Sequence, residues 1–174
     1  MNYLEKLLDG VEVEWKALGE VCEIKTGKGV TKKDSLETGK YPIISGGKDP
    51  MGYIDSYNRK ENTVTISRVG ANAGYVSFIS NKFYLNDKCF SIIPHSSVKL
   101  NINSKFLYYY LKSIEEHIIR LQSEGGVPTI NTSKLSILYI PIPSLAIQQK
   151  IVGILDTFSE LTAELTAELT AELT

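Results

Sequence analysis

The C-terminal segment 144–174 has the most regular pattern of apolar positions in the chain. From Ile147 to Leu165 the apolar side chains are spaced four, three, four, three and four residues apart, which is the heptad seam of a coiled coil. Beyond Leu165 the spacing becomes four and four, which unwinds a supercoil. The pattern predicts a helical rod about 45 Å long, capped by Ser144. The seam expected to face a second copy consists of Ile147, Ile151, Ile154, Phe158, Leu161, Leu165 and Leu169.

The end of this segment repeats Thr-Ala-Glu-Leu over 162–173. Ala, Glu and Leu favour the helix, and Thr opposes it only mildly. Four residues advance a helix by about 6 Å and turn it by about 400°, so each Leu lies about 40° beyond the previous one. One repeat more or less would change the length of the rod and preserve its apolar stripe. We therefore predict a spacer whose length is set by the number of repeats; the alternative is a solvated helix that frays.

In the rest of the chain, the spacing of the apolar residues changes twice, from strand-like to helical and back. Between Trp15 and Pro94 it consists of short strand-like runs separated by Gly, Asn, Asp and Pro. Segment 101–124 returns to helical spacing, with Asn103 or Ser104 as its N-cap, and a final short strand is expected at 135–143. The predicted apolar face of this helix comprises Phe106, Tyr110, Ile114, Ile118 and Leu121.

Many short strands and one amphipathic helix predict an α+β fold. We expect two parts: a small domain over 1–143, with a curled, mostly antiparallel sheet and a packed helix, and a long C-terminal coiled-coil helix over 144–174. The βαβ alternation that is typical of cofactor-using enzymes of this size is absent from the pattern.

Charge is unevenly distributed along the chain, although the formal net charge is −1. Residues 15–105 carry fourteen Lys or Arg against eight Asp or Glu, whereas 144–174 carry one Lys and five acids. A basic domain joined to an acidic rod can bind polyanions. No apolar stretch reaches the roughly 20 residues of a membrane span and no signal peptide is evident, so we expect a cytoplasmic protein. Cys22 and Cys89 are expected to be buried and unpaired.

Two glycine-rich loops carry the candidate binding residues. Segment 44–54 has paired glycines followed by Lys48, so its backbone can approach a ligand closely. Segment 67–78 places Arg68 at a strand end and Asn72 between two glycines, and these side chains suit guanine and adenine edges. Lysines in 25–33 could contact phosphates. The alternative is that the glycines serve tight turns and the lysines are ordinary surface charge. The candidate DNA-binding set is Lys25, Lys28, Lys32, Lys33, Ser45, Gly46, Gly47, Lys48, Arg68, Asn72 and Lys88.

No motif in the sequence predicts catalysis or metal binding. Neither a phosphate-binding GxxxxGK[ST] loop nor a GxGxxG turn is present. The Asn-Pro-Pro-aromatic tetrapeptide that an amino-methyltransferase needs is also missing. His95 and His117 have no Cys or Ser partner nearby in the sequence, and Glu115 and Glu116 are adjacent, which places them about 100° apart on a helix. We expect a binding protein without a catalytic residue, a metal ion or a cofactor of its own.

Several segments together resemble the specificity subunit of type I restriction-modification enzymes. They are EWKALGEVCEIKTGKG, YPIISGGKDPMGYID, TVTISRVGANAGYV, LNDKCFSI and the long run GGVPTINTSKLSILYIPIPSLAIQQKIVGILDTFSELTAEL. The resemblance implies a target recognition domain that reads one half of a split DNA site, and a conserved spacer helix that sets the distance to a second domain. It also implies two kinds of partner: modification subunits, which bind S-adenosylmethionine, and restriction subunits.

The chain departs from this family in having one recognition domain and one spacer where a full subunit has two of each. It resembles an amino-terminal half, and we expect two copies to pair through their rods and to read an interrupted palindrome. A competing hypothesis is a coiled-coil interaction module whose globular head binds protein. A stand-alone methyltransferase is disfavoured by the missing motifs.

Overall fold

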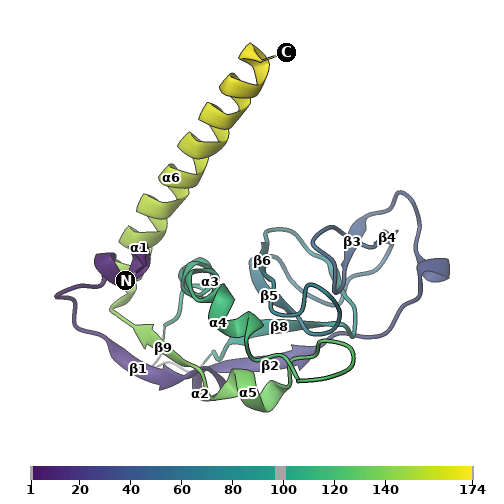
Figure 1. Ribbon diagram of the computed structural model, residues 1–174, viewed down its shortest axis with the longest axis horizontal. Helices are drawn as coiled ribbons and strands as arrows, with labels where there is room; N and C mark the ends of the chain where they lie inside the picture. Colours follow the sequence, from purple (N-terminus) through teal and green to yellow (C-terminus); the bar gives the residue numbers. More distant parts are fainter. Residues whose placement is uncertain (1, 97–100, 174) are drawn as a thin grey trace.

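A four-stranded antiparallel sheet forms the centre of the molecule. The computed structural model describes residues 2–96 and 101–173. The sheet has the order β2-β8-β5-β6, and Figure 1 shows it beside the helices α3 and α4. Its inner strand β5 is buried at all five positions, which agrees with a sequence, TVTIS, that contains no charge. The strands are β2 (Cys22–Thr26), β5 (Thr63–Ser67), β6 (Val76–Ile79) and β8 (Cys89–Pro94).

Two smaller sheets flank the central one. A three-stranded sheet has the order β4-β3-β7, in which β3 and β7 are parallel. A two-stranded antiparallel ribbon joins β1 to β9. Phe83, Leu85 and Cys89 form a second, smaller core. The strands are β1 (Glu14–Ala17), β3 (Tyr41–Ile44), β4 (Tyr53–Ile54), β7 (Tyr84–Leu85) and β9 (Tyr139–Ile142). The predicted α+β class with a mostly antiparallel sheet is confirmed.

The helices lie outside the sheets, and α3 packs against β5 and β6. Asn103 caps α3 by accepting hydrogen bonds from Lys105 N and Phe106 N, so the expected cap is confirmed. The helices are α1 (Tyr3–Leu7), α2 (Leu18–Val21), η1 (Lys32–Asp34), α3 (Ser104–Ser113), α4 (Glu115–Ile119), α5 (Thr132–Ser136) and α6 (Leu145–Glu172).

Two sequence predictions differ from the structure. The helix expected over 101–124 is broken at Ile114, whose φ of −109° and ψ of 17° are not helical, and two short helices result. Tertiary contacts flank the break: Lys112 and Glu115, on either side of it, both form hydrogen bonds with Val76 of the edge strand β6. The strand expected over 135–143 is confined to 139–142, and its first part is the end of α5.

The predicted C-terminal rod is a single helix, α6, which Ser144 caps through its side chain. Figure 1 shows its far end projecting away from the sheets. Its first turns are joined to the domain by Gln148, which is fully buried. Gln148 accepts a hydrogen bond from Asn103 N at 2.8 Å and donates to Asn101 O and Pro143 O at 3.0 and 2.9 Å. The division of the chain at residue 143 stays a prediction.

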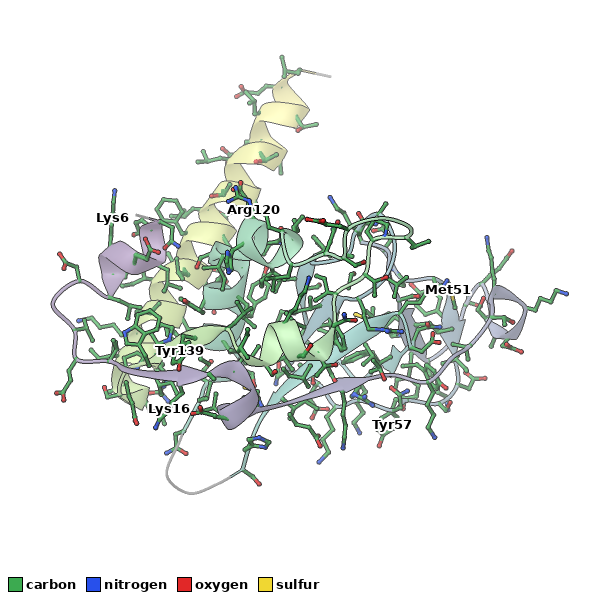
Figure 2. The ribbon with its side chains drawn as sticks, turned by 60° about the horizontal axis from the view of Figure 1, so that its bottom comes forward. Lys6, Lys16, Met51, Tyr57, Arg120 and Tyr139 are labelled. Atoms are coloured by element: carbon green, nitrogen blue, oxygen red, sulfur yellow. The ribbon has the colours of Figure 1, made fainter. Side chains whose placement is uncertain are left out.

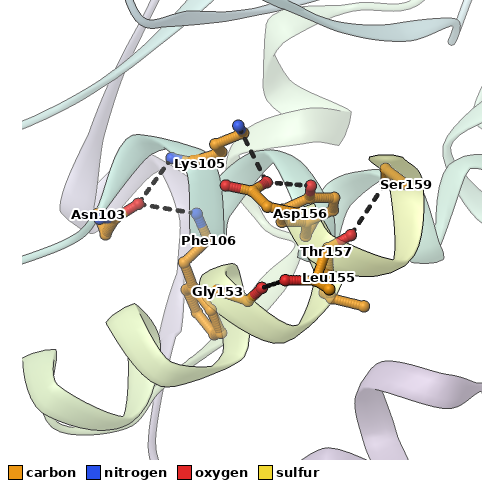
Figure 3. Close-up of polar contacts among 9 residues, drawn as sticks. Asn103, Lys105, Phe106, Gly153, Leu155, Asp156, Thr157 and Ser159 are labelled. Carbon is orange, nitrogen blue, oxygen red and sulfur yellow. Dashed lines mark hydrogen bonds and ion pairs between the residues drawn. The ribbon is translucent and has the colours of Figure 1, made fainter. Parts of the chain in front are cut away.

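A second contact between α3 and α6 lies about two turns further along the rod. Asp156 accepts a hydrogen bond from the Tyr109 hydroxyl at 2.5 Å and forms an ion pair with Lys105 at 2.9 Å. Figure 3 shows Asp156 facing Lys105 across the two helices. These contacts fix the direction in which the rod leaves the domain.

Candidate nucleic-acid interface

Three loops converge on the segment 85–88, which joins β7 to β8. Lys28 N donates a hydrogen bond to Leu85 O at 3.0 Å, and Asn86 N donates to Ile44 O at 2.9 Å. Arg68 N donates to Lys88 O at 2.9 Å. Loops that lie far apart in the sequence are therefore adjacent in the fold, and they bring together candidate residues from each of them.

A buried asparagine stabilises this junction. Asn86 is 2% exposed. Its amide donates to Val30 O at 2.9 Å, and its carbonyl oxygen accepts from Lys88 N at 3.1 Å. Buried polar groups need such partners. Sequence reasoning missed Asn86; the Asn-Asp pair directly after a strand, a common turn signal, could have identified it.

Two glycines make the close packing of these loops possible. A Cβ on Gly46 would lie 2.6 Å from Val69 O, and a Cβ on Gly27 would collide with the carbonyl group of Leu85. Neither position tolerates a side chain without movement of the backbone. Gly46 therefore serves the approach of one loop to another. Gly47 beside it has more room, with its nearest neighbour at 3.5 Å.

The backbone and Nε of Arg68 are held by hydrogen bonds, whereas its terminal nitrogens are free. Its carbonyl oxygen accepts from Ile130 N at 2.9 Å, and Nε donates to Asp87 O at 3.1 Å. Its guanidinium carbon lies 5.9 Å from the centre of the Phe90 ring. Within the described residues, neither Nη atom has a hydrogen-bond partner. These donors are available for a bidentate contact with an acceptor outside the chain.

The turn that carries Asn72 is supported by the segment after α4. Gln122 Nε2 donates to Ala73 O at 2.7 Å, and Gly70 N donates to Pro128 O at 3.0 Å. Gly74 has a φ of +99°, and a Cβ there would lie 2.8 Å from Ile119 Cα. Asn72 is half-buried at the start of this turn.

The remaining candidates fall into three groups. Lys28, Lys48 and Lys88 are exposed, and no carboxylate in the described parts of the chain lies within ion-pair distance of them. Ser45 is buried and lines a cavity of about 20 Å³ beneath its loop, together with Gly47 and Ser67. The third group, Lys25, Lys32 and Lys33, is less closely associated with the junction.

Lys25 is paired with Glu23 on its own strand at 2.6 Å. Lys32 and Lys33 are exposed in η1, which Figure 1 shows at the end of the molecule beyond β3 and β4. The loops thus bring Lys28, Lys48, Arg68 and Lys88 to one region. The third group, Lys25, Lys32 and Lys33, lies outside this region. The assignment of all these residues to DNA stays a prediction.

Neither cysteine provides a reactive group. Burial raises the pKa of the Cys22 and Cys89 thiols to about 12, so both are protonated at neutral pH. Among the residues that the structure describes, no group of three His, Cys, Asp or Glu side chains could hold a metal ion. In the same residues, no helix is long and apolar enough to cross a membrane.

The apolar stripe of α6 is exposed except near its start. Ile151 is only 3% exposed, whereas Leu165 is 65% exposed. The expectation that Ile151 belongs to an exposed seam is wrong, because the first turns of α6 pack on α3. Ile147 is half-buried, and the Phe158 ring lies 5.9 Å from that of Tyr3. The exposed stripe consists of Ile154, Phe158, Leu161, Leu165 and Leu169.

A second face of the rod is lined by Thr and Ala. The hydroxyls of Thr162, Thr166 and Thr170 donate to the carbonyl oxygens four residues earlier at 2.7–2.8 Å. These hydroxyls are satisfied within the helix, as expected for Thr at such positions. The Thr and Ala side chains form a continuous face of the rod between Phe158 and Ala171.

Comparison with known proteins is consistent with this architecture. A family model described as the type I restriction modification DNA specificity domain matches residues 10–174. A putative type I restriction enzyme specificity subunit of Haemophilus influenzae is 35% identical over 166 residues, which are 93% of this chain and 41% of that protein. The EcoR124I/EcoR124II specificity subunit of Escherichia coli is 34% identical over 180 residues, which are 94% of this chain and 42% of that protein.

The fold has solved counterparts. The S subunit of a type I restriction-modification system from Mycoplasma genitalium superposes with a TM-score of 0.79 at 26% identity, covering 91% of this chain and 42% of that one. This chain therefore spans less than half the length of these relatives. Because the family model matches nearly the whole sequence, the chain belongs to the type I restriction-modification DNA specificity domain family.

Proposed function

We propose that this chain is the DNA-reading part of a type I specificity subunit, and that its domain binds one half of a split duplex site. The observation that carries the proposal is the convergence of loops on residues 85–88, which gathers Lys28, Lys88 and Arg68 in one region. Lys48 lies beside them, since it lines a small cavity with Ser67 and Cys89. Several cations on one surface attract the phosphate backbone. An arginine with free Nη atoms among them supplies base readout.

The candidate residues have different roles in this proposal. Arg68 and Asn72 contact base edges, since Arg suits guanine and Asn suits adenine. Lys28, Lys48 and Lys88 contact phosphates and position the domain without reading sequence. Lys25, Lys32 and Lys33 contribute at the periphery. Asn86, Gly46 and Gly27 keep the loops in place and do not touch the DNA.

The rod is proposed to join two recognition domains. The exposed stripe from Ile154 to Leu169 is a large apolar surface, and soluble proteins cover such surfaces with a partner. A second copy in antiparallel orientation, related by a two-fold axis, would cover it and place one domain at each end. Two identical domains would then read identical half-sites in inverted orientation, so the target is an interrupted palindrome.

The chain itself performs no chemistry in this proposal and acts in the cytoplasm. Modification subunits that bind S-adenosylmethionine methylate the site, and restriction subunits act on DNA that lacks this methylation. The specificity domain decides where both are placed.

A selection experiment tests the proposal. The chain is assembled with its cognate modification subunits and incubated with a pool of randomised duplexes, and bound sequences are determined. We expect an interrupted palindrome to be enriched, and we expect the Arg68→Ala variant to lose enrichment at one base pair of each half-site. Equal binding of every duplex by the wild-type complex would contradict the proposal and favour a protein-binding module.

A further inference from the structure

Two lysine ammonium groups from different parts of the chain lie over the ring of Tyr75. Lys112 Nζ lies 4.3 Å from the centre of the ring, and Lys48 Nζ lies 5.4 Å from it. Lys112 belongs to α3, Lys48 follows β3, and Tyr75 directly precedes β6. The face of an aromatic ring attracts cations within about 6 Å. One phenol ring therefore connects the helix with the loop that contains Lys48.

The two lysines differ in how their charge is compensated. Lys112 Nζ lies 2.6 Å from Glu115 Oε2 and donates to Val76 O at 3.1 Å. The same carboxylate accepts a hydrogen bond from Val76 N at 2.8 Å. Lys48 is exposed, and no carboxylate within the described ranges forms an ion pair with it. The uncompensated charge at this ring is therefore that of Lys48.

The backbone of Tyr75 is fixed on both sides. Tyr75 N donates to Asn72 O at 2.9 Å, and its carbonyl oxygen accepts from Ser67 N at 3.0 Å. Ser67 is the last residue of β5 and directly precedes Arg68. Ser67, Tyr75 and Lys48 also line the same small cavity. The ring is thus attached to the strand that presents Arg68.

We infer that Tyr75 is a positioning residue for DNA binding, whose ring holds the Lys48 ammonium ready to meet a phosphate at the edge of the surface that carries Arg68. The inference rests on the proposed function. A free lysine side chain loses considerable rotamer freedom when it is immobilised by a ligand. A ring that restrains Lys48 beforehand reduces this loss on binding. Tyr75 then increases affinity only while Lys48 is present.

A double-mutant cycle tests this dependence. The variants Lys48→Met, Tyr75→Leu and their combination are assembled with the modification subunits. Their affinity for the duplex selected above is measured between 50 and 200 mM NaCl. Lys48→Met should reduce the slope of log affinity against log salt by about 0.9, the effect of one lost phosphate contact. Tyr75→Leu alone should weaken binding by about two- to fivefold. In the Lys48→Met background, it should have no further effect.

Two further variants separate positioning from a general role in stability. Tyr75→Phe keeps the ring, so it should bind like the wild type. Tyr57 provides a matched control, because Lys82 Nζ lies 4.8 Å from its ring centre. Figure 2 shows Tyr57 at the end of the molecule away from Lys6 and α1, and its ring packs against that of Tyr41, with ring centres 5.1 Å apart. Tyr57→Leu should leave DNA affinity unchanged. Additive losses in the double variant, or a loss in Tyr75→Phe as large as in Tyr75→Leu, would overturn the inference.

A measurement without DNA distinguishes the inference from the proposed function. In the wild type and in Tyr75→Phe, the ring should shift the NMR signals of the Lys48 ε-methylene protons upfield, and Tyr75→Leu should abolish the shift. If this shift is present and the assembled wild type binds no duplex, the proposed function fails, and the inference fails with it. If duplex is bound and the losses are additive, the inference alone fails. Absence of the shift in the wild type also rejects it.

Discussion

At the scale of single residues, Arg68 has the strongest geometry for reading a base. Hydrogen bonds fix its backbone and Nε, so little freedom remains to be lost when its terminal nitrogens meet a guanine. We predict that Arg68→Ala costs about 1–3 kcal/mol at the selected site and relaxes preference at one base pair. Lys28→Ala should instead weaken all sequences alike and flatten the salt dependence. Affinities for duplexes that differ by one base pair measure both; identical profiles for both variants would contradict the assignment.

Gln148 provides a test of how the rod is attached. Its buried amide satisfies Asn103 N and two carbonyl oxygens. Gln148→Leu removes the partner of Asn103 N and of two carbonyl oxygens, of which that of Pro143 is in a buried contact, so it should lower the free energy of unfolding by about 1–3 kcal/mol. The neighbouring Gln149 is exposed, and Gln149→Leu should change stability little. Urea denaturation of both variants measures the difference; equal stability would show that the Gln148 contacts contribute nothing.

At the scale of elements, the sequence predicted the helices that have a regular apolar spacing. It did not predict the features that depend on contacts between distant parts of the chain. The rod and the caps at Asn103 and Ser144 follow from local sequence, because spacing and capping are properties of neighbouring residues. The break at Ile114 does not, since 104–119 contain no Gly or Pro and the flanking contacts are to Val76 on β6. The gathering of Lys28, Lys48 and Arg68 also depends on long-range pairing with 85–88. Residue types could therefore identify candidates, but only the fold separates them from Lys32 and Lys33.

The junction between α3 and α6 should weaken at high pH. Burial, together with the hydrogen bond that the Tyr109 hydroxyl donates to Asp156, raises the pKa of this phenol from 10.0 to about 12. The unfolded chain releases this proton near its ordinary pKa, whereas the folded chain keeps it. The contribution is therefore complete below about pH 10 and is lost as the pH rises towards about 12.

We predict that Tyr109→Phe has a smaller decrease in melting temperature between pH 9 and pH 11.5 than the wild type. Tyr109→Phe keeps the ring and removes only the hydroxyl that donates to Asp156, so the difference reports on that hydroxyl. Thermal unfolding followed by circular dichroism at the two pH values provides the measurement. An identical decrease in both proteins would show that the Tyr109–Asp156 contact does not contribute.

At the scale of the whole molecule, the exposed stripe of α6 predicts the oligomeric state. Leu165→Asp places a charge in this stripe and should convert dimers to monomers at tens of micromolar, as measured by analytical ultracentrifugation. Ile151 is unsuitable for this test, because its burial within the domain would confound dissociation with unfolding. Ala167→Asp adds the same charge on the Thr/Ala face and should leave the dimer intact. Dissociation by Ala167→Asp and not by Leu165→Asp would assign pairing to that other face.

The uninterrupted helix of α6 also couples distance to rotation. Each Thr-Ala-Glu-Leu unit turns the rod by about 40° beyond a full turn while it advances about 6 Å, and each base pair of B-DNA turns its neighbours by about 34–36°. Deleting one unit, such as 166–169, should therefore shorten the gap between methylated half-sites by one base pair, because this keeps each domain facing its groove. Loss of two base pairs would rotate one half-site about 30° more than the deleted repeat rotates the domain, so we expect a loss of one base pair. The repeat is longer than one base pair, and a tilt of the rods across the DNA axis accommodates this difference in length. Mapping methylated sites for the deletion variant measures the gap, and an unchanged gap would show that the rod does not control the phase between the two domains.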